Sequence, residues 1–295
     1  MRMRTVFRAG VTTVGLGAAT LAYASLVERN LFTLRRFDVP VLAPDAEPLR
    51  VLHLSDLHMT PGQRRKQDWV AGLAATDPDL VVVTGDFLAH PDAVPAVARA
   101  LQPLLDLPGA FVFGSNDYHG PVFKNPFGYF NRNREYRHGA DLPTEDLRTL
   151  LVSSGWVDLN NRRATVKAGG RVIEAAGVDD PHIGRDVYRS GAVDPAADLH
   201  LGMTHSPEPR VVDDMAADGF DVVLAGHTHG GQVCVPGYGA LVTNCGLDRR
   251  MAKGLHRWQA TDTWLHVSAG VGTHPTAPVR FACPPEASIL TLIAR

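Results

Sequence analysis

Short apolar runs recur along this chain, and they limit the folds open to it. They read LRVLHLSD, DLVVVTGD, GAFVFGSND, RVIEAAGVDD, LHLGMTHS, DVVLAGHTH and WLHVSAG. Runs this short, rich in Val, Ile and Leu and ended by Gly, Asp or Asn, are typical of buried strands. Helix-like stretches lie between the first ones, at residues 67–75 and 93–105. Strands that alternate with helices favour an α/β fold. The later part is poorer in helix, which indicates that the sheet architecture changes after the midpoint.

The composition is that of a globular chain with a large core. The 295 residues are 45% hydrophobic and 20% charged, which suits one large domain or two small ones. The net charge is -2 at pH 7, so nothing in the charge balance points to nucleic acid, and we expect none as a partner.

The N-terminus differs from the rest of the chain. MRMRTVFR carries three arginines, and residues 9–27 follow without a charge. That length just reaches what a membrane span needs. AYAS offers a cleavage site, so residues 1–30 are either a signal peptide or a membrane anchor. A buried amphipathic helix is the alternative, although the run shows no polar face. Arginines before the span favour a protein anchored in the membrane or exported, with its catalytic domain outside the cytoplasm.

The stretch VPVLAPDAEP, residues 39–48, contains prolines and an Asp that resist regular structure. We expect an extended linker over residues 31–47 and a single domain over residues 48–295.

Polar side chains able to bind a metal follow five of the apolar runs. They are Asp56 and His58, Asp86, Asn116 and Asp117, His205, and His227 and His229. In open α/β sheets, active sites gather just beyond the carboxyl ends of the strands. The pattern therefore predicts one site to which five strand ends contribute.

The residue types indicate the metals. Imidazole combined with carboxylate and amide oxygen suits Mn, Fe or Zn, whereas oxygen ligands alone suit Mg or Ca. One ion rarely needs so many ligands, but two ions bridged by a carboxylate can use them all. Taken singly, each Asp or His is more often a helix cap or a turn residue. We expect structural roles for His53, His256, His266 and His274, and leave His182 and His200 open.

In their order, these motifs resemble those of the calcineurin-like metallophosphoesterases. That family shows D-x-H, G-D, G-N-H-[DE], a lone His and G-H-x-H; this chain shows DLH, GD, GSND, THS and GHTH. The N-terminus and LSDLH look most like the bacterial branch that includes exported phosphodiesterases and lipid-sugar pyrophosphatases. The resemblance implies a four-layer α/β/β/α sandwich. It also implies two divalent ions, with Asp56, His58 and His229 on the first, Asn116, His205 and His227 on the second, and Asp86 bridging them.

The GSND block departs from the family pattern. With Asn116 as the ligand, Asp117 takes the place of the family's catalytic His. With the acidic residue aligned instead, Ser115 takes the ligand place and Asn116 the place of that His. The candidates for catalytic roles beside the metals are therefore Asp117, His119 and Asn116.

The implied activity is hydrolysis of a phosphodiester or phosphomonoester by a hydroxide that bridges the two metals. The alternatives are a pyrophosphatase that acts on a nucleotide- or lipid-linked diphosphate, and a metal-binding scaffold without turnover. We expect a phosphorylated small molecule or a lipid-linked compound as substrate. The aromatic and basic insertion at residues 124–138 is either a binding segment for the phosphate or acyl group or a solvated loop.

Overall fold

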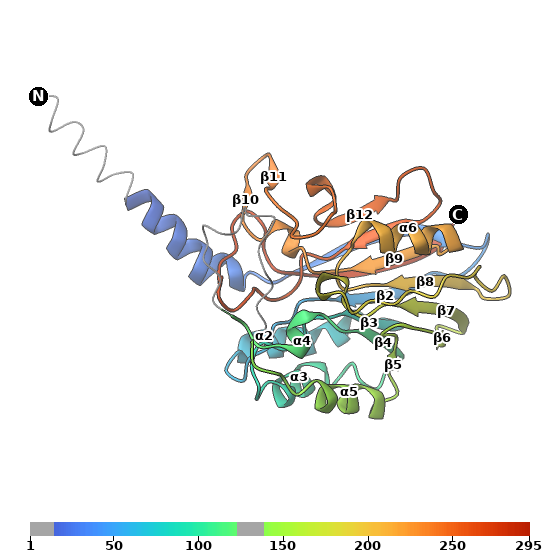
Figure 1. Ribbon diagram of the computed structural model, residues 1–295, viewed down its shortest axis with the longest axis horizontal. Coiled ribbons are helices and arrows are strands. Elements are labelled where there is room, and N and C mark those ends of the chain that lie inside the picture. The colour runs from blue at the N-terminus through green and yellow to red at the C-terminus, as the bar shows by residue number, and fades with distance from the viewer. Residues whose placement is uncertain (1–14, 123–138) are drawn as a thin grey trace, which may run out of the picture.

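A computed structural model describes residues 15–122 and 139–295 of the chain. It has a mixed α/β fold with two six-stranded sheets (Figure 1). In spatial order, the first sheet contains β1 (Thr33–Leu42), β14 (Glu286–Ala294), β2 (Leu49–Leu54), β3 (Leu80–Thr84), β4 (Gly109–Val112) and β5 (Val157–Asp158). The second contains β12 (Gly254–Arg257), β13 (Trp264–Val267), β9 (Val222–Ala225), β8 (Leu199–Met203), β7 (Arg171–Gly177) and β6 (Arg162–Ala168). A hairpin of β10 (Cys234–Val235) and β11 (Gly239–Ala240) stands apart from both sheets.

The helices join these strands. The α-helices are α2 (Arg64–Gly72), α3 (Val94–Leu101), α4 (Ser115–Tyr118), α5 (Thr144–Ser153) and α6 (Pro209–Asp218). Short 3-10 helices cover Glu28–Asn30, Leu73–Thr76, Pro181–Ile183, His229–Gly231 and Arg249–Met251, and a π-helical segment covers Tyr23–Val27. Strands β2, β3, β4 and β5 run parallel to one another, as expected where helices connect them, whereas β2 is antiparallel to β14.

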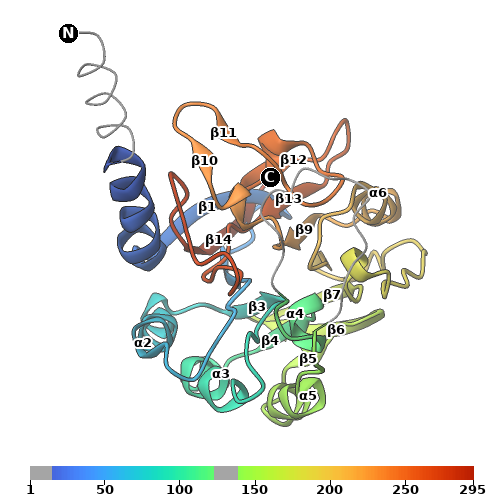
Figure 2. The ribbon, with the colours of Figure 1, turned by 60° about the vertical axis from the view of Figure 1, so that its left-hand side comes forward.

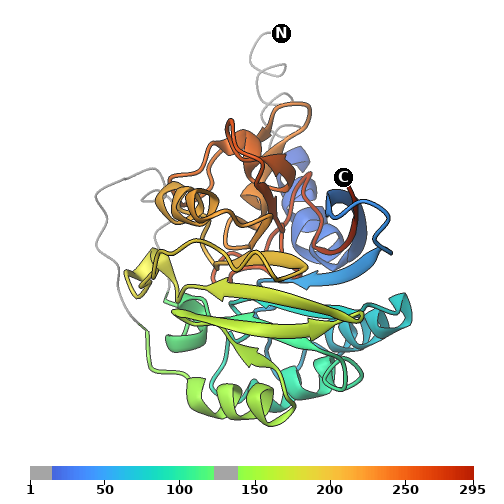
Figure 3. The same cartoon turned by 90° about the vertical axis from the view of Figure 1, so that its right-hand side faces the viewer.

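Strand β3 shows how the sequence builds the core. All five of its residues are buried, because the first sheet is covered on both faces. Val81 and Val83 pack toward α2, α3 and α5, whereas Leu80 and Val82 pack against residues of the second sheet. A third apolar cluster joins the second sheet to α6 through Val212. Figure 3 shows the sheets side by side, with α5 and α6 on opposite sides of the molecule.

The N-terminal segment extends away from the sheets. Residues 15–22 form a helix that projects from the body of the molecule in Figure 1. The structure shows, within its described residues, no helix with the length and apolar character needed to cross a membrane. Residues 1–14 of the expected signal or anchor, like the insertion at 124–138, lie outside the described residues.

The prediction of an extended linker over residues 31–47 is wrong for most of that segment. Thr33–Leu42 forms β1, which pairs in parallel with β14 along the edge of the first sheet. Pro40 lacks a backbone N–H, but an edge strand bonds a neighbour on one side only and tolerates this. Val39 and Val41 point into the core between the sheets. The sheet therefore begins upstream of residue 48.

Candidate metal centre

The predicted site residues follow strand ends of both sheets. Asp56 follows β2, Asp86 follows β3, and Asn116 lies on α4 just beyond β4. His58 also follows β2, and the other sheet contributes the remaining histidines: His205 follows β8, and the loop after β9 carries His227 and His229. Five of these side chains sit on backbone with a positive φ: Asp56 (50°), His58 (40°), Asp86 (56°), His227 (69°) and His229 (50°). Such backbone is costly for residues with a Cβ, and it concentrates at functional sites.

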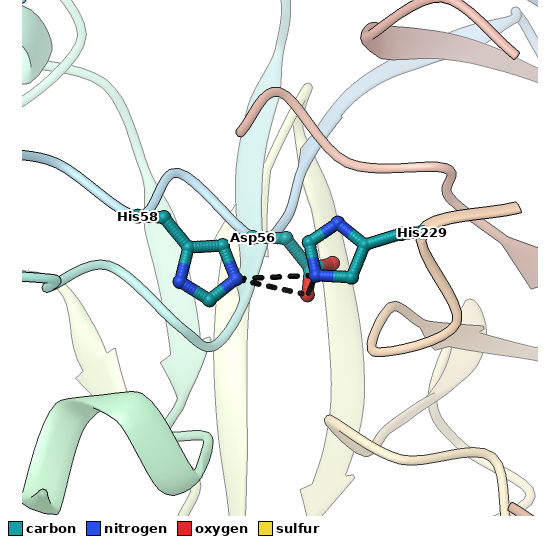
Figure 4. A group of neighbouring side chains, drawn as sticks. All are labelled: Asp56, His58 and His229. Atoms are coloured by element: carbon teal, nitrogen blue, oxygen red, sulfur yellow. Dashed lines mark hydrogen bonds and ion pairs between the residues drawn. The ribbon is translucent and has the colours of Figure 1, made fainter. Parts of the chain in front are cut away.

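The first group brings together Asp56, His58 and His229 (Figure 4). The Nε2 atoms of the two histidines lie 3.2 Å apart, and Asp56 Oδ1 lies 3.5 Å from Nε2 of His229. Burial lowers the pKa of His58 to about 3 and that of His229 well below its ordinary value, so both rings are neutral. Asp56 Oδ1 is buried without a hydrogen-bond partner among the described residues. Lone pairs that converge in this way fit a cation.

The second group consists of Asp56, Asp86 and His205. His205 Nδ1 lies 2.7 Å from the carbonyl oxygen of Thr84, which fixes a proton on that nitrogen. Its buried Nε2 then faces Asp86 Oδ2 at 3.4 Å, and it has no hydrogen-bond partner among the described residues. Burial lowers the pKa of His205, but the Asp86 carboxylate raises it by more, so that it lies well above its ordinary value. The space between these two atoms attracts positive charge, which a metal ion would supply.

Asp86, a member of the second group, also lies close to the first. Its Oδ2 is 3.4 Å from Nε2 of His58 and 3.4 Å from Nε2 of His205. Asn116 contacts the same carboxylate, with its backbone N–H on Oδ1 and its side-chain Nδ2 on Oδ2, each at 2.8 Å. A carboxylate placed in this way can join two ions.

His227 lies beside the two groups and belongs to neither. Its backbone N–H donates to Asp56 Oδ2 at 3.1 Å, and its ring centroid is 5.2 Å from that of His205. On its other side the ring contacts His182, with centroids 4.5 Å apart. The structure thus places Asp56, His58, Asp86, His205 and His229 in two tight groups, and Asn116 and His227 directly against them.

The comparisons with known proteins agree with this geometry. Residues 49–231 match the family model for the calcineurin-like phosphoesterases. The chain belongs to this family. It is 29% identical over 234 residues to the metallophosphoesterase YkoQ of Bacillus subtilis, covering 78% of each chain. It is 27% identical to the phosphodiesterase YaeI of Escherichia coli, covering 94% of this chain and 96% of that protein. It is 25% identical to the UDP-2,3-diacylglucosamine pyrophosphatase LpxG of Chlamydia trachomatis, covering 92% of each. The chain is a metal-dependent phosphoesterase.

Two of the predicted catalytic residues of this phosphoesterase have hydrogen-bond partners other than the metal-ligand side chains. Asp117 accepts hydrogen bonds from the backbone N–H groups of Asp86, Phe87, Leu88 and Gly114, at 2.7 to 3.1 Å. Burial raises the pKa of Asp117 to about 8, but a proton on either oxygen would face those N–H groups and not a substrate. His119 Nδ1 lies 3.2 Å from Asp141. Asn116, by contrast, donates from its side-chain Nδ2 to the Asp86 carboxylate.

Two buried cations support the phosphoesterase site and have no sequence signal. Lys66 donates to the carbonyl oxygens of Leu57 and His58 at 2.6 and 3.3 Å. Arg280 is fully buried and donates to the carbonyl oxygens of His229, Ala269, Gly270, Gly272 and Cys283. Both hold the backbone of loops that carry metal-ligand candidates. In the sequence, Lys66 lies in RRKQ and Arg280 in VRFAC, which look like ordinary surface segments.

Proposed function

We propose that this phosphoesterase holds two divalent ions joined by Asp86 and hydrolyses a phosphodiester by attack of a water-derived nucleophile on phosphorus. The position of Asp86 Oδ2, 3.4 Å from the Nε2 atoms of His58 and His205, supports the proposal best. Two ions held there would polarise the phosphoryl oxygens and lower the pKa of a bound water.

The proposed first ion is held by Asp56, His58, His229 and Asp86. The second is held by Asn116, His205, His227 and Asp86. Asn116 now presents Nδ2 to Asp86, and a turn of its carboxamide about the last bond would present the oxygen instead. The mixture of imidazole, carboxylate and amide favours Mn, Fe or Zn over Mg or Ca.

The proposed substrate is a phosphorylated small molecule or a lipid-linked compound. The relative YaeI is named as a phosphodiesterase, and the likeness spans almost the whole of both chains. The alternative is a diphosphate linked to a nucleotide or a lipid, which the name of LpxG as a pyrophosphatase favours. We further propose that the N-terminal segment, residues 1–30, contacts a membrane and that the phosphoesterase domain, which includes β1, acts outside the cytoplasm. The uncharged run at residues 9–27 after three arginines supports this.

The four-layer α/β/β/α order is likewise a proposal, supported by three apolar clusters. One lies between the sheets, and one lies between each sheet and its helices.

The test combines metal analysis with hydrolysis. Purified protein is analysed for Mn, Fe and Zn, and is then given bis-p-nitrophenyl phosphate, p-nitrophenyl phosphate and a nucleotide diphosphate sugar. We expect two ions per chain and turnover of the diester, both lost in Asp86→Asn and kept in the surface control Asp68→Asn. Cleavage of the diphosphate alone would favour the pyrophosphatase. Two ions without any turnover would contradict the proposed hydrolysis, and one ion would contradict the bridging role of Asp86.

A further inference from the structure

Exposed apolar side chains gather in two segments of this protein. Among the described residues, large hydrophobic side chains are exposed at Leu16, Leu21, Tyr23, Leu26, Val27 and Leu31, and again at Val233, Val235, Tyr238 and Leu241. The remaining exposed ones of the described residues are Val152, Val172 and Val187, each in a different element. We name the two segments, residues 15–31 and 233–241, the apolar ridge. A cluster of exposed apolar side chains of this kind indicates a surface that binds a protein, a membrane or a ligand.

The hairpin half of the ridge is unusual for a hairpin in water. Cys234 and Ala240 are paired across the strands, and each is only 5% exposed. Val235 and Tyr238 point outward and are 44% and 57% exposed. An outward face normally carries polar or charged side chains. Here no charged residue occurs between His229 and Asp248. Both faces of the hairpin are therefore apolar.

The turn of the hairpin presents this apolar tip firmly. Tyr238 N–H donates to the carbonyl oxygen of Val235 at 3.0 Å, with Pro236 in the second position and Gly237 at φ 77° in the third. Pro followed by a residue with positive φ is the pattern of a type II turn. The tip is thus a defined turn with an exposed aromatic ring.

Both halves of the ridge rest on one segment, residues 277–283. On the helix side, Ala24 accepts a hydrogen bond from Arg280 N–H at 3.1 Å, and Arg29 donates to Pro278 O at 3.3 Å. On the hairpin side, Cys234 N–H donates to Phe281 O at 2.8 Å. Figures 1 and 2 both show the helix and the hairpin on the same side of the molecule. The helix and the hairpin are therefore both held by the same segment of the chain.

Charge at the edge of the ridge indicates what covers it. The Arg249 guanidinium lies 4.0 Å from the centre of the Tyr238 ring in the hairpin half of the ridge. Arg29, in the helix half, donates to Pro278 O at 3.3 Å. Aromatic rings and arginines that flank an apolar surface are typical of proteins at the interface of a lipid bilayer, where the cations meet anionic headgroups.

We propose that the apolar ridge binds the surface of an anionic lipid bilayer, with the β10–β11 hairpin inserted beside the N-terminal helix. Residues 15–23 are exposed around the whole helix, so the helix has no polar face to turn toward water. The hairpin follows directly on the loop of His227 and His229. A bilayer that covers the ridge therefore lies next to the metal centre. This inference concerns binding and does not depend on the proposed reaction.

The first test places a tryptophan at the hairpin tip. The full chain with Tyr238→Trp is mixed with vesicles of phosphatidylcholine and phosphatidylglycerol that contain brominated acyl chains, which quench nearby indole rings. The matched control is Val187→Trp, also exposed but outside the ridge. We expect additional quenching in Tyr238→Trp and none in Val187→Trp. Equal quenching of the two variants, while the chain is bound to the vesicles, would show that the hairpin stays in water and would overturn the proposal.

The second test separates lipid from protein as the occupant. Val235→Asp combined with Leu241→Asp is compared with Val152→Asp combined with Val187→Asp, and both are checked for an unchanged melting temperature. We expect about tenfold weaker flotation with the vesicles for the hairpin variant alone, because two charges would have to enter the interface. If the hairpin variant instead dissociates an oligomer measured by light scattering and binds vesicles normally, the ridge is a contact between protein chains and the proposal is wrong.

Discussion

The guanidinium of Arg280 lies against the far side of the His229 ring, with Nη2 3.3 Å from Nδ1. The Nε2 atom on the opposite side of that ring faces His58 and Asp56. After burial and His58, the Arg280 charge also lowers the pKa of His229, which keeps the ring neutral as a metal ligand must be. A residue that no sequence pattern marks therefore controls both the position and the charge of a metal-ligand candidate.

Substitution of Arg280 tests this control. Arg280→Met leaves buried carbonyl oxygens without donors, so we expect a loss of stability on the order of 3–5 kcal/mol. Arg280→Lys keeps the charge but not the planar set of donors, and we expect metal affinity to fall about 10- to 100-fold. Titration calorimetry with Mn²⁺ and denaturant unfolding measure the two effects. Arg250→Lys, on the surface, is the control. Wild-type affinity in Arg280→Lys would show that position 280 needs only a cation.

Single histidine substitutions should remove the ions one at a time. His58→Ala takes a ligand from the first group, and His205→Ala takes one from the second. We expect each variant to retain about one ion per chain and to lose roughly three orders of magnitude in kcat, because the ions act together on one phosphoryl group. Elemental analysis beside diester hydrolysis measures both. His200→Ala, whose ring binds Asp221 away from the centre, is the matched control. Retention of two ions in either variant would contradict the grouping.

The metal-ligand candidates could be predicted from the sequence because each of them follows a local pattern. Asp56, Asp86 and His205 each follow a short apolar run, and strands of that kind bring their carboxyl ends together. Arg280 shows no such pattern, since its partner His229 lies 51 residues away and the contact depends on how several loops close. The expectation of a linker was wrong for β1 because Pro40, with Pro44 and Asp45 after it, resembles a linker, although an edge strand accepts a proline. The hydrogen bonds of Asp117 could not be predicted from the sequence, because its four backbone partners come together only when the loops fold; its catalytic role stays a prediction.

Asp180 should make the stability of the metal-free protein depend on pH. It is fully buried, its Oδ2 has no hydrogen-bond partner among the described residues, and burial raises its pKa from 3.8 to about 7. Between these values the folded state binds the proton and the unfolded state does not, so the contribution of Asp180 to stability is lost as the pH rises through about 7. We therefore expect Asp180→Asn to become more stable relative to wild type, by on the order of 2–4 kcal/mol, between about pH 4 and about pH 8.

Denaturant unfolding of wild type and Asp180→Asn across this range measures the difference. The buried histidines titrate in both proteins, so their contribution to the pH dependence of the unfolding free energy cancels in the difference. For the control Asp106→Asn, at an exposed position, the unfolding free energy should depend on pH as it does in wild type. A constant difference between Asp180→Asn and wild type would mean that Asp180 is ionised throughout.

Gly226 should resist even the smallest side chain, because the two sheets meet there. A Cβ at this position would lie 1.8 Å from Ser55 Oγ and 2.6 Å from Asp56 Oδ2, and Ser55 itself donates to that carboxylate at 2.7 Å. We expect Gly226→Ala to displace Asp56, to release an ion and to lower kcat/KM at least 100-fold, roughly the cost of misplacing a reacting group by an ångström. Gly62→Ala, where a Cβ meets nothing within 4 Å, should behave as wild type. Metal content and diester hydrolysis of both variants decide the matter. Full activity in Gly226→Ala would show that the loop of His227 and His229 can move away from β2 without losing the site.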